Sequence, residues 1–130
     1  VLLRVLLGQP DRLAEWAEVE LAVGSALVEV ECLRALDRLR LREHLTPEDL
    51  AVRRETVYRL TAGMEVVEPT WPVLRRAGQP FPTVLGTLDA VHLATALLWR
   101  DTRGDDLVLA THDRALALAA RASGLTVIGA

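Results

Sequence analysis

Apolar positions recur along the chain with two different periods, which separates short strand-like runs from longer helical ones. The first seven residues are apolar apart from Arg4 and predict a helix that is ended by Gly8 and Pro10. Residues 11–19 predict a second, shorter helix, and residues 20–24 predict a short strand. The amino-terminal part of the chain is therefore expected to run helix, helix, strand.

A long helix is predicted to follow this strand, with Ser25 as its cap and an end near Leu41. Its apolar residues repeat every three or four positions, which is the spacing of one buried helical face. We expect that stripe to consist of Val28, Cys32, Ala35, Leu36 and Leu39. The next helix has a clear start signal, because Thr46 can cap it and Pro47 suits its first position. It is expected to run to about Ala62, just before a glycine that ends it.

The second half of the chain continues the alternation. MEVVE at residues 64–68 predicts a strand with two inward valines, and residues 71–76 predict a short helix. The prolines of GQPFP mark a loop, an apolar helix runs over about residues 86–100, and RGDD forms a turn. LVLA at residues 107–110 is apolar throughout, as strands of parallel sheets are. A helix over HDRALALAARASG, capped by Thr111, and a last strand over TVIG complete the pattern.

Strands that alternate with helices predict an α/β protein, in which a parallel sheet is covered by helices on both faces. The strands are too far apart in the sequence to form hairpins. This arrangement normally begins with a strand, and the first strand is missing from a chain that starts in a helix. At 130 residues the chain has the length of one domain, so we expect a single domain over residues 1–130.

Composition and charge narrow the class of protein further. Apolar residues make up 51% and charged residues 25% of the chain, which fits a compact soluble domain and excludes a disordered one. The net charge of −3 gives no overall positive field of the kind that attracts nucleic-acid duplexes, although all 15 basic residues are arginine. The start of the chain is too short and too interrupted by Arg4 for a secretory signal or a membrane span, so we expect a cytoplasmic protein. Cys32 has no partner cysteine and is expected to be a core thiol.

Three carboxylates, Glu31, Asp89 and Asp113, lie near points where a strand-like run gives way to a helical one. In an open α/β sheet such junctions gather outside the carboxyl ends of the strands, where sites of this architecture are built. Carboxylates that lie close together repel one another unless a proton or a cation intervenes, and oxygen ligands suit Mg²⁺ or Mn²⁺. The three acids are therefore candidate catalytic residues and metal ligands.

The surroundings of Glu31 allow two interpretations. It shares a helical flank with Arg34, Arg38 and Arg42, so it can belong to a solvated ladder of ion pairs worth about 0.2–0.5 kcal/mol each. In the functional interpretation Glu31 is a metal ligand, and Arg34 and Arg38 bind the phosphates of a substrate. Glu29 falls on another part of the helical wheel and is expected to be a surface residue.

Asp89 and Asp113 also have an interpretation without function, because the helix dipole favours an acid in a first helical turn. That does not explain why three separate junctions should all carry an acid. His92 and His112 lie close to these acids in the sequence but match no compact zinc or iron motif, so we expect hydrogen-bonding roles for them. The tryptophans are dispersed, and core or interface packing is a better expectation for them than base stacking: Trp16, Trp71 and Trp99.

At these residues the chain resembles the PIN-domain family, specifically the VapC-type ribonuclease toxins of bacterial toxin–antitoxin pairs. The similar stretches are VLLRVLLGQPDRL, SALVEVECLRAL, LDAVHLATAL and LATHDRALALAARASGL, which follow the family's order over nearly the whole chain. The resemblance implies a PIN-like three-layer α/β/α sandwich with a central parallel sheet of five strands. It places Glu31, Asp89 and Asp113 on three of the family's four acidic positions, and Thr111 on the hydroxyl position that accompanies the last acid. The fourth acid would lie shortly before Val1, in the missing first strand.

The resemblance implies a Mg²⁺- or Mn²⁺-dependent endoribonuclease toxin that cleaves single-stranded regions of RNA. The implied partners are an RNA substrate, a cognate antitoxin that covers the acidic groove, and a second copy of the chain in a homodimer. A non-catalytic PIN-like module that binds RNA or protein is the alternative, and the missing first acid favours it. A receiver-type phosphoacceptor domain also has clustered acids, but it needs a lysine near its site and this chain has none.

Overall fold

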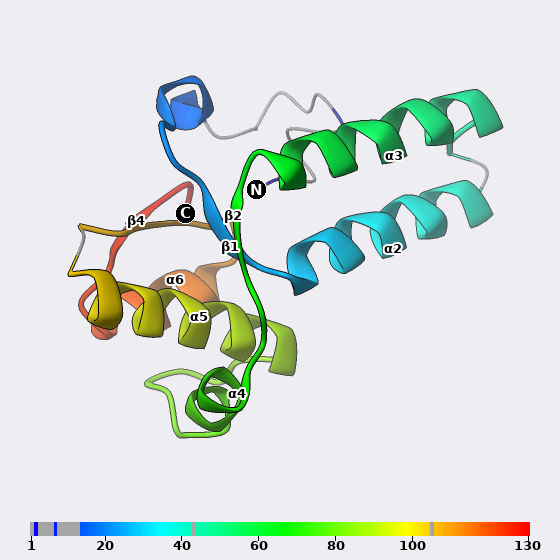
Figure 1. Cartoon of the computed structure of the whole chain (residues 1–130). Helices are drawn as coiled ribbons and strands as arrows, with labels where there is room; N and C mark the ends of the chain where they lie inside the picture. The colour runs from blue at the N-terminus through cyan, green and yellow to red at the C-terminus, as the bar shows by residue number, and fades with distance from the viewer. Residues whose placement is uncertain (1, 3–6, 8–13, 43, 105) are drawn as a thin grey trace. The chain divides into compact units, whose positions relative to one another are not determined.

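The computed structural model describes residues 2, 7, 14–42, 44–104 and 106–130 of the chain (Figure 1). Most of the helix predicted over the first seven residues lies outside the described residues. The chain divides into two compact units, an amino-terminal unit that extends to Val66 and a carboxyl-terminal unit that begins at Val67. Each unit is described by itself.

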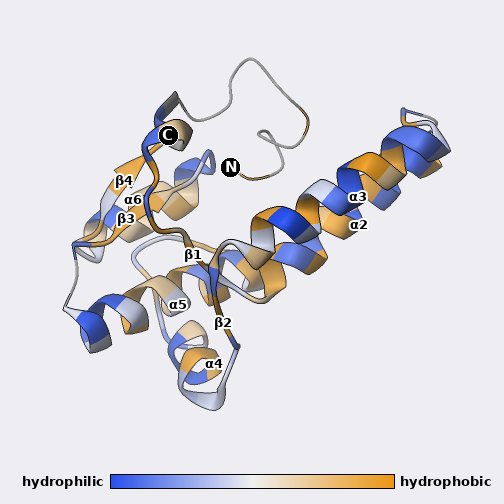
Figure 2. Ribbon diagram, turned by 45° about the horizontal axis from the view of Figure 1, so that its top comes forward, coloured by the Kyte–Doolittle hydropathy of each residue, from blue (hydrophilic) through white to orange (hydrophobic). Residues whose placement is uncertain are grey.

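Two long helices and a pair of short strands form the amino-terminal unit. Helices α2 and α3 pack against each other, and both carry apolar and polar residues along their length (Figure 2). The strand β1 pairs with β2, next to a bond in which Glu65 N donates to the Ala22 carbonyl at 2.9 Å. The elements are the 3₁₀ helix η1 (Ala14–Glu18), β1 (Val23–Ser25), α2 (Leu27–Leu41), α3 (Pro47–Ala62) and β2 (Glu65–Val67).

Local capping explains where these two helices begin. The Ser25 hydroxyl accepts a hydrogen bond from Leu27 N at 3.3 Å, at the first residue of α2. The Thr46 hydroxyl accepts from Asp49 N at 3.1 Å, and Pro47 is the first residue of α3. Each hydroxyl satisfies a backbone donor that the first helical turn leaves without a partner. The predicted cap and start of α3 are therefore confirmed. The prediction that Ser25 caps α2 is wrong, because α2 begins at Leu27 and its capping residue is Ala26, which lies one position closer to the helix.

The predicted buried stripe of α2 is confirmed at its centre. Cys32 and Leu36 are 5% and 0% exposed and pack against Val57 of α3, which is 1% exposed. Val28 and Leu39, at the two ends of the stripe, are only half-buried. The prediction that both valines of β2 face inward is wrong for Val66, which is 46% exposed; a two-stranded sheet leaves one of its faces uncovered in this part of the chain.

The carboxyl-terminal unit places one central helix, α5, against two others. Helix α5 packs against α4 and against α6, and β3 pairs with β4 in parallel, Leu109 opposite Val127. Leu93 of α5 is fully buried in a core shared with Leu97, Leu116 and Leu125. The elements are α4 (Trp71–Ala77), α5 (Thr87–Arg103), β3 (Val108–Ala110), α6 (Arg114–Ala122) and β4 (Thr126–Ile128).

Helices and strands alternate along the chain, which confirms the predicted α/β class, and the β3–β4 pair is parallel as expected. Strands joined through a helix lie parallel because the helix returns the chain to the end of the sheet at which the first strand began. Helix α5 ends at Gly104, whose φ of 69° is the left-handed conformation that glycine adopts without strain. Within the described ranges, no helix is both long enough and apolar enough to cross a membrane.

Candidate functional site

Asp113 lies at the junction of β3 and α6, where the structure fixes both its backbone and its side chain. Thr111 N donates to the Ile128 carbonyl at 3.1 Å, which ties the junction to β4. The Thr111 hydroxyl accepts from Asp113 N at 3.0 Å, and Asp113 Oδ1 accepts from Leu116 N at 2.8 Å. Thr111 is only 6% exposed, so its hydroxyl has a fixed environment. The carboxylate of Asp113 is therefore held in one orientation at the start of α6.

The prediction that Thr111 caps α6 is wrong, because Asp113 is the capping residue. Both side chains can cap a helix, and the one directly before the first helical residue takes that position. Helix α6 begins at Arg114, so Thr111 lies too early and satisfies the backbone of Asp113 instead. Asp113 is exposed, and because a carboxylate has about four acceptor sites, capping leaves it able to bind a cation.

His112 ties the same junction to the segment that follows β4. Its Nδ1 lies 2.6 Å from the Gly129 carbonyl oxygen, so Nδ1 carries the proton of this hydrogen bond. The other ring nitrogen, Nε2, is buried and has no hydrogen-bond partner in the described part of the protein. The hydrogen-bonding role predicted for this histidine is confirmed, and it adds a second link between the Asp113 junction and the end of β4.

Asp89 lies in the first turn of α5, whose capping residue is Gly86. Its side chain is half-buried and folds back along the helix, since a Cβ built at Gly86 would lie 3.7 Å from Asp89 Oδ2. The amino-terminal end of a helix carries a partial positive charge that favours a carboxylate there. Because α5 packs against α6, Asp89 and Asp113 belong to the amino-terminal ends of two helices in contact.

Glu31 lies on α2, in the amino-terminal unit, and is half-buried. Of the arginines on its flank, Arg34 pairs with Asp37 at 3.0 Å, and Arg38 is exposed. Asp37 also accepts from Arg40 at 2.7 Å, and this hydrogen bond is the main reason why the pKa of Asp37 is lowered. Arg34 uses one guanidinium nitrogen for Asp37 and is 64% exposed, so its remaining donors can bind a phosphate.

Glu29 is not the surface residue that the helical wheel indicates. It is half-buried, and its Oε2 accepts a hydrogen bond of 2.7 Å from the Thr61 hydroxyl of α3. Thr61 is 6% exposed and also donates toward the Val57 carbonyl at 3.1 Å. The polar contact between α2 and α3 explains the burial of Glu29. The sequence hint of this contact is a threonine on the apolar face of α3, which can be interpreted only once the contact is known.

The donors offered by the candidate residues fit Mg²⁺ or Mn²⁺, because they are all carboxylate or hydroxyl oxygens. Among the described residues, no three His, Cys, Asp or Glu side chains lie together in a group that could hold a metal ion. Glu31 belongs to the amino-terminal unit, and Asp89, Thr111 and Asp113 belong to the carboxyl-terminal unit. The structure brings Thr111 and Asp113 together directly and places Asp89 on the helix that packs against α6.

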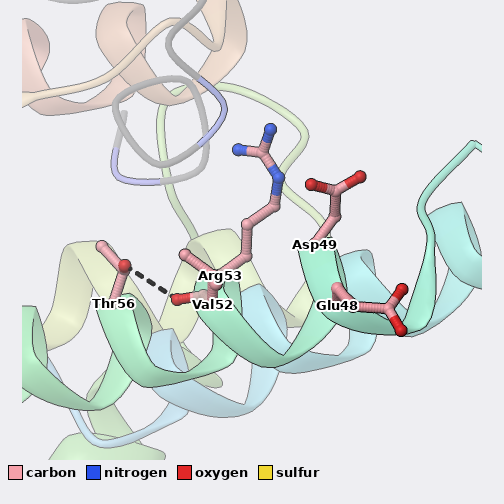
Figure 3. A pocket seen from close by; sticks show the side chains of 5 residues that line it. All are labelled: Glu48, Asp49, Val52, Arg53 and Thr56. Carbon is pink, nitrogen blue, oxygen red and sulfur yellow. Dashed lines mark hydrogen bonds between the residues drawn. The ribbon is translucent and has the colours of Figure 1, made fainter.

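A surface pocket lies elsewhere, along α3 (Figure 3). One of its residues, Thr56, uses its hydroxyl to donate to the Val52 carbonyl at 2.9 Å. The pocket is not lined by any of the candidate residues, and its described lining comes from one helix and mixes acids with an arginine: Glu48, Asp49, Val52, Arg53 and Thr56. The pocket therefore does not support a substrate site on α3.

Comparison with known protein families shows which family these candidate residues belong to. The model of the PIN domain matches residues 1–122 and so includes every candidate site residue. A search of curated proteins and a search of solved structures both find no match. PIN domains have an α/β fold and are generally nucleases that act on RNA with Mg²⁺ or Mn²⁺. The chain belongs to the PIN-domain family.

Proposed function

We propose that this protein is a Mg²⁺- or Mn²⁺-dependent endoribonuclease of the VapC toxin type, which cleaves single-stranded regions of RNA. The observation that supports this most strongly is the fixed carboxylate of Asp113, held by Leu116 N at 2.8 Å and backed by Thr111 at a strand-to-helix junction. A metal ligand needs an orientation set by its own surroundings. The match to the PIN family supports the nuclease class.

In this proposal Glu31, Asp89 and Asp113 hold the ion. The Thr111 hydroxyl orients Asp113 by accepting a hydrogen bond from the backbone N–H of Asp113. When bound, Mg²⁺ or Mn²⁺ supplies an activated water and neutralises charge on the scissile phosphate. The carboxylates would by themselves repel RNA, so the acids and the cation act as one unit. Arg34 and Arg38 are both exposed and bind phosphates along the strand in this proposal.

We further propose that a cognate antitoxin neutralises the enzyme by covering the acids, with an arginine as the complementary group. A homodimer is supported by the apolar residues that α2 and α3 expose, since Val30, Leu41 and Val52 are 54%, 64% and 64% exposed. Exposed apolar side chains of this size are typical of surfaces that bind other proteins. Light scattering should give twice the mass of the chain, and a strict monomer would contradict the dimer.

The test is cleavage of a single-stranded RNA by the full-length protein. Cleavage should stop in EDTA, return with Mn²⁺, and leave 5′-phosphate and 3′-hydroxyl ends. Asp89→Asn and Asp113→Asn should each abolish it. Glu48→Gln is the matched control, because Glu48 is an exposed acid in the first turn of α3 and should be dispensable.

Cleavage that resists EDTA would refute the metal-dependent mechanism, and full activity in Asp89→Asn or Asp113→Asn would remove that residue from the site. RNA binding with no cleavage in any divalent cation would instead favour a non-catalytic PIN-like module.

A further inference from the structure

The segment from residue 69 to residue 88 carries a local positive charge. It contains two arginines and no acid, although the whole chain has 18 acids and a net charge of −3. It also holds Trp71 and Phe81, two of the few aromatic residues of the chain. The segment comprises α4 and the loop that leads into α5, directly before Asp89.

Trp71 presents its indole to solvent at the start of α4. Trp71 is 71% exposed, which contradicts core packing and leaves interface packing, the other part of the prediction, untested. The guanidinium of Arg75, one helical turn further on, lies over the indole with its carbon 5.8 Å from the ring centroid. An exposed aromatic ring next to a cation suits a ligand that carries both a flat ring and a negatively charged group.

Arg76 adds a second cation with an unused donor. Its guanidinium carbon lies 4.5 Å from the centroid of the Phe81 ring, which holds the side chain in place. Its Nη1 is buried and has no hydrogen-bond partner among the described residues. A buried donor without an acceptor is costly, so a shift of the Arg76 side chain that brings Nη1 to a phosphate oxygen would be favourable.

Two other arginine–aromatic pairs in the described structure lack this combination. On α3, Arg54 lies over Tyr58 but also donates to its hydroxyl at 3.0 Å, and acids share the helix. On α5, Arg103 lies over Trp99, which is half-buried. Neither pair combines a ring as exposed as that of Trp71 with a stretch of sequence that contains no acid.

We infer that Trp71, Arg75 and Arg76, called here the α4 platform, bind single-stranded RNA by stacking an unpaired base on Trp71 and pairing the arginines with adjoining phosphates. The inference rests on the proposed ribonuclease function and names how its substrate is held. Stacking on an aromatic ring accepts any base, and phosphate contacts position the strand. Because α4 packs against α5, the platform holds the strand in the same unit as Asp89 (Figure 1).

Fluorescence anisotropy with a labelled single-stranded RNA of eight nucleotides, in EDTA, measures binding without cleavage. Trp71→Ala should raise the Kd by about 5- to 150-fold, whereas Trp71→Phe, which keeps a stacking ring, should retain most of the affinity. Arg75→Gln should weaken binding and reduce the slope of log Kd against log salt by about 0.7. Tyr58→Ala is the matched control, since Tyr58 is 45% exposed beside Arg54, and it should bind as the wild type does.

A probe with abasic nucleotides should bind the wild type more weakly but should lose nothing further in Trp71→Ala, because both changes remove the same stacking contact. Wild-type affinity in Trp71→Ala would overturn the α4 platform. So would a variant that binds RNA normally but changes from dimer to monomer in light scattering, because the surface would then bind a second copy of the chain.

The proposed nuclease function and the α4 platform can be refuted independently of each other. Loss of binding in Trp71→Ala, in a protein that never cleaves RNA, supports the platform and refutes the nuclease. Metal-dependent cleavage by a protein whose Trp71→Ala variant binds RNA unchanged refutes the platform alone. Circular dichroism of each variant should match the wild type, since the removed side chain is largely exposed.

Discussion

Asp113 carries two separable roles, a helix cap and a metal ligand, and three substitutions distinguish them. Asparagine keeps an oxygen at the position of Oδ1 and loses the charge. Serine keeps a shorter capping oxygen, and alanine keeps neither. The cap is the 2.8 Å hydrogen bond from Leu116 N to Asp113 Oδ1, at the start of the nine-residue helix α6.

The magnitude follows from the position of this cap. Replacing a capping Asp by Ala costs about 0.5–2 kcal/mol, and Asn caps about as well as Asp. Loss of the negative charge at the helix end costs about 0.3–1 kcal/mol at an exposed position. We therefore expect Asp113→Ala to lower the free energy of unfolding by about 1.5 kcal/mol, and Asp113→Asn by about 0.5 kcal/mol. Both should be inactive as ribonucleases, because neither provides a carboxylate.

Urea unfolding followed by circular dichroism measures the first quantity, and metal-dependent RNA cleavage measures the second. Asp113→Ser should resemble Asp113→Asn in stability and in its loss of cleavage. Equal destabilisation by Asn and Ala would show that the side-chain oxygen does not cap α6. Cleavage by Asp113→Asn at the wild-type rate would show that the charge has no part in catalysis.

Three further predictions concern the two cores and the single thiol. Thr61→Val removes the donor to Glu29 Oε2 and should destabilise the protein by about 1–3 kcal/mol in urea unfolding, while Thr61→Ser should cost much less; equal losses would contradict the hydrogen bond. Leu93→Ala, at a side chain that is 0% exposed, should cost about 2–5 kcal/mol against well under about 1 kcal/mol for the exposed Leu88→Ala, and similar costs would contradict the described core. Burial raises the pKa of the Cys32 thiol, so less thiolate is present at a given pH, and a disulfide reagent should modify native protein far more slowly than urea-unfolded protein. Equal rates would show that Cys32 is accessible.

Local rules of helix structure could be read from the sequence because they involve neighbouring residues only. Thr46 and Pro47 predict the start of α3, and the hydrogen bond of 3.1 Å from Asp49 N to the Thr46 hydroxyl confirms it. The parallel strand at residues 107–110 was predicted from its apolar character, and β3 forms there. These elements needed no knowledge of distant parts of the chain.

Features that depend on a competition or on a distant partner were predicted less well. Thr111 and Asp113 both suit a cap, and only the residue at which α6 begins decides between them. Glu29 reads as a surface residue until Thr61, 32 positions away, supplies its hydrogen bond. Trp71 was expected in a core or an interface, and the core alternative is wrong because the short helix α4 buries only the face that carries Val73, which is 4% exposed.

The candidate site divides in the same way. The sequence correctly places Asp89 in the first turn of α5. It places Asp113 inside the first turn of a helix capped by Thr111, whereas Asp113 is itself the capping residue of α6. The approach of Glu31 to these two acids depends on packing between segments far apart in the chain, which no local pattern determines. The shared-ion claim thus remains a prediction of the family resemblance and of the carboxylate chemistry.

Binding of Mn²⁺ without RNA tests that claim most directly. Titration of the full-length protein by electron paramagnetic resonance should show saturable Mn²⁺ binding. Glu31→Gln, Asp89→Asn and Asp113→Asn should each raise the Kd for Mn²⁺ by about tenfold or more, since losing even a group that only supports a metal ligand has an effect of this size. Glu48→Gln should bind as the wild type does. If the wild type binds no Mn²⁺, or if the three variants bind it as tightly as the wild type, these acids do not share a metal ion.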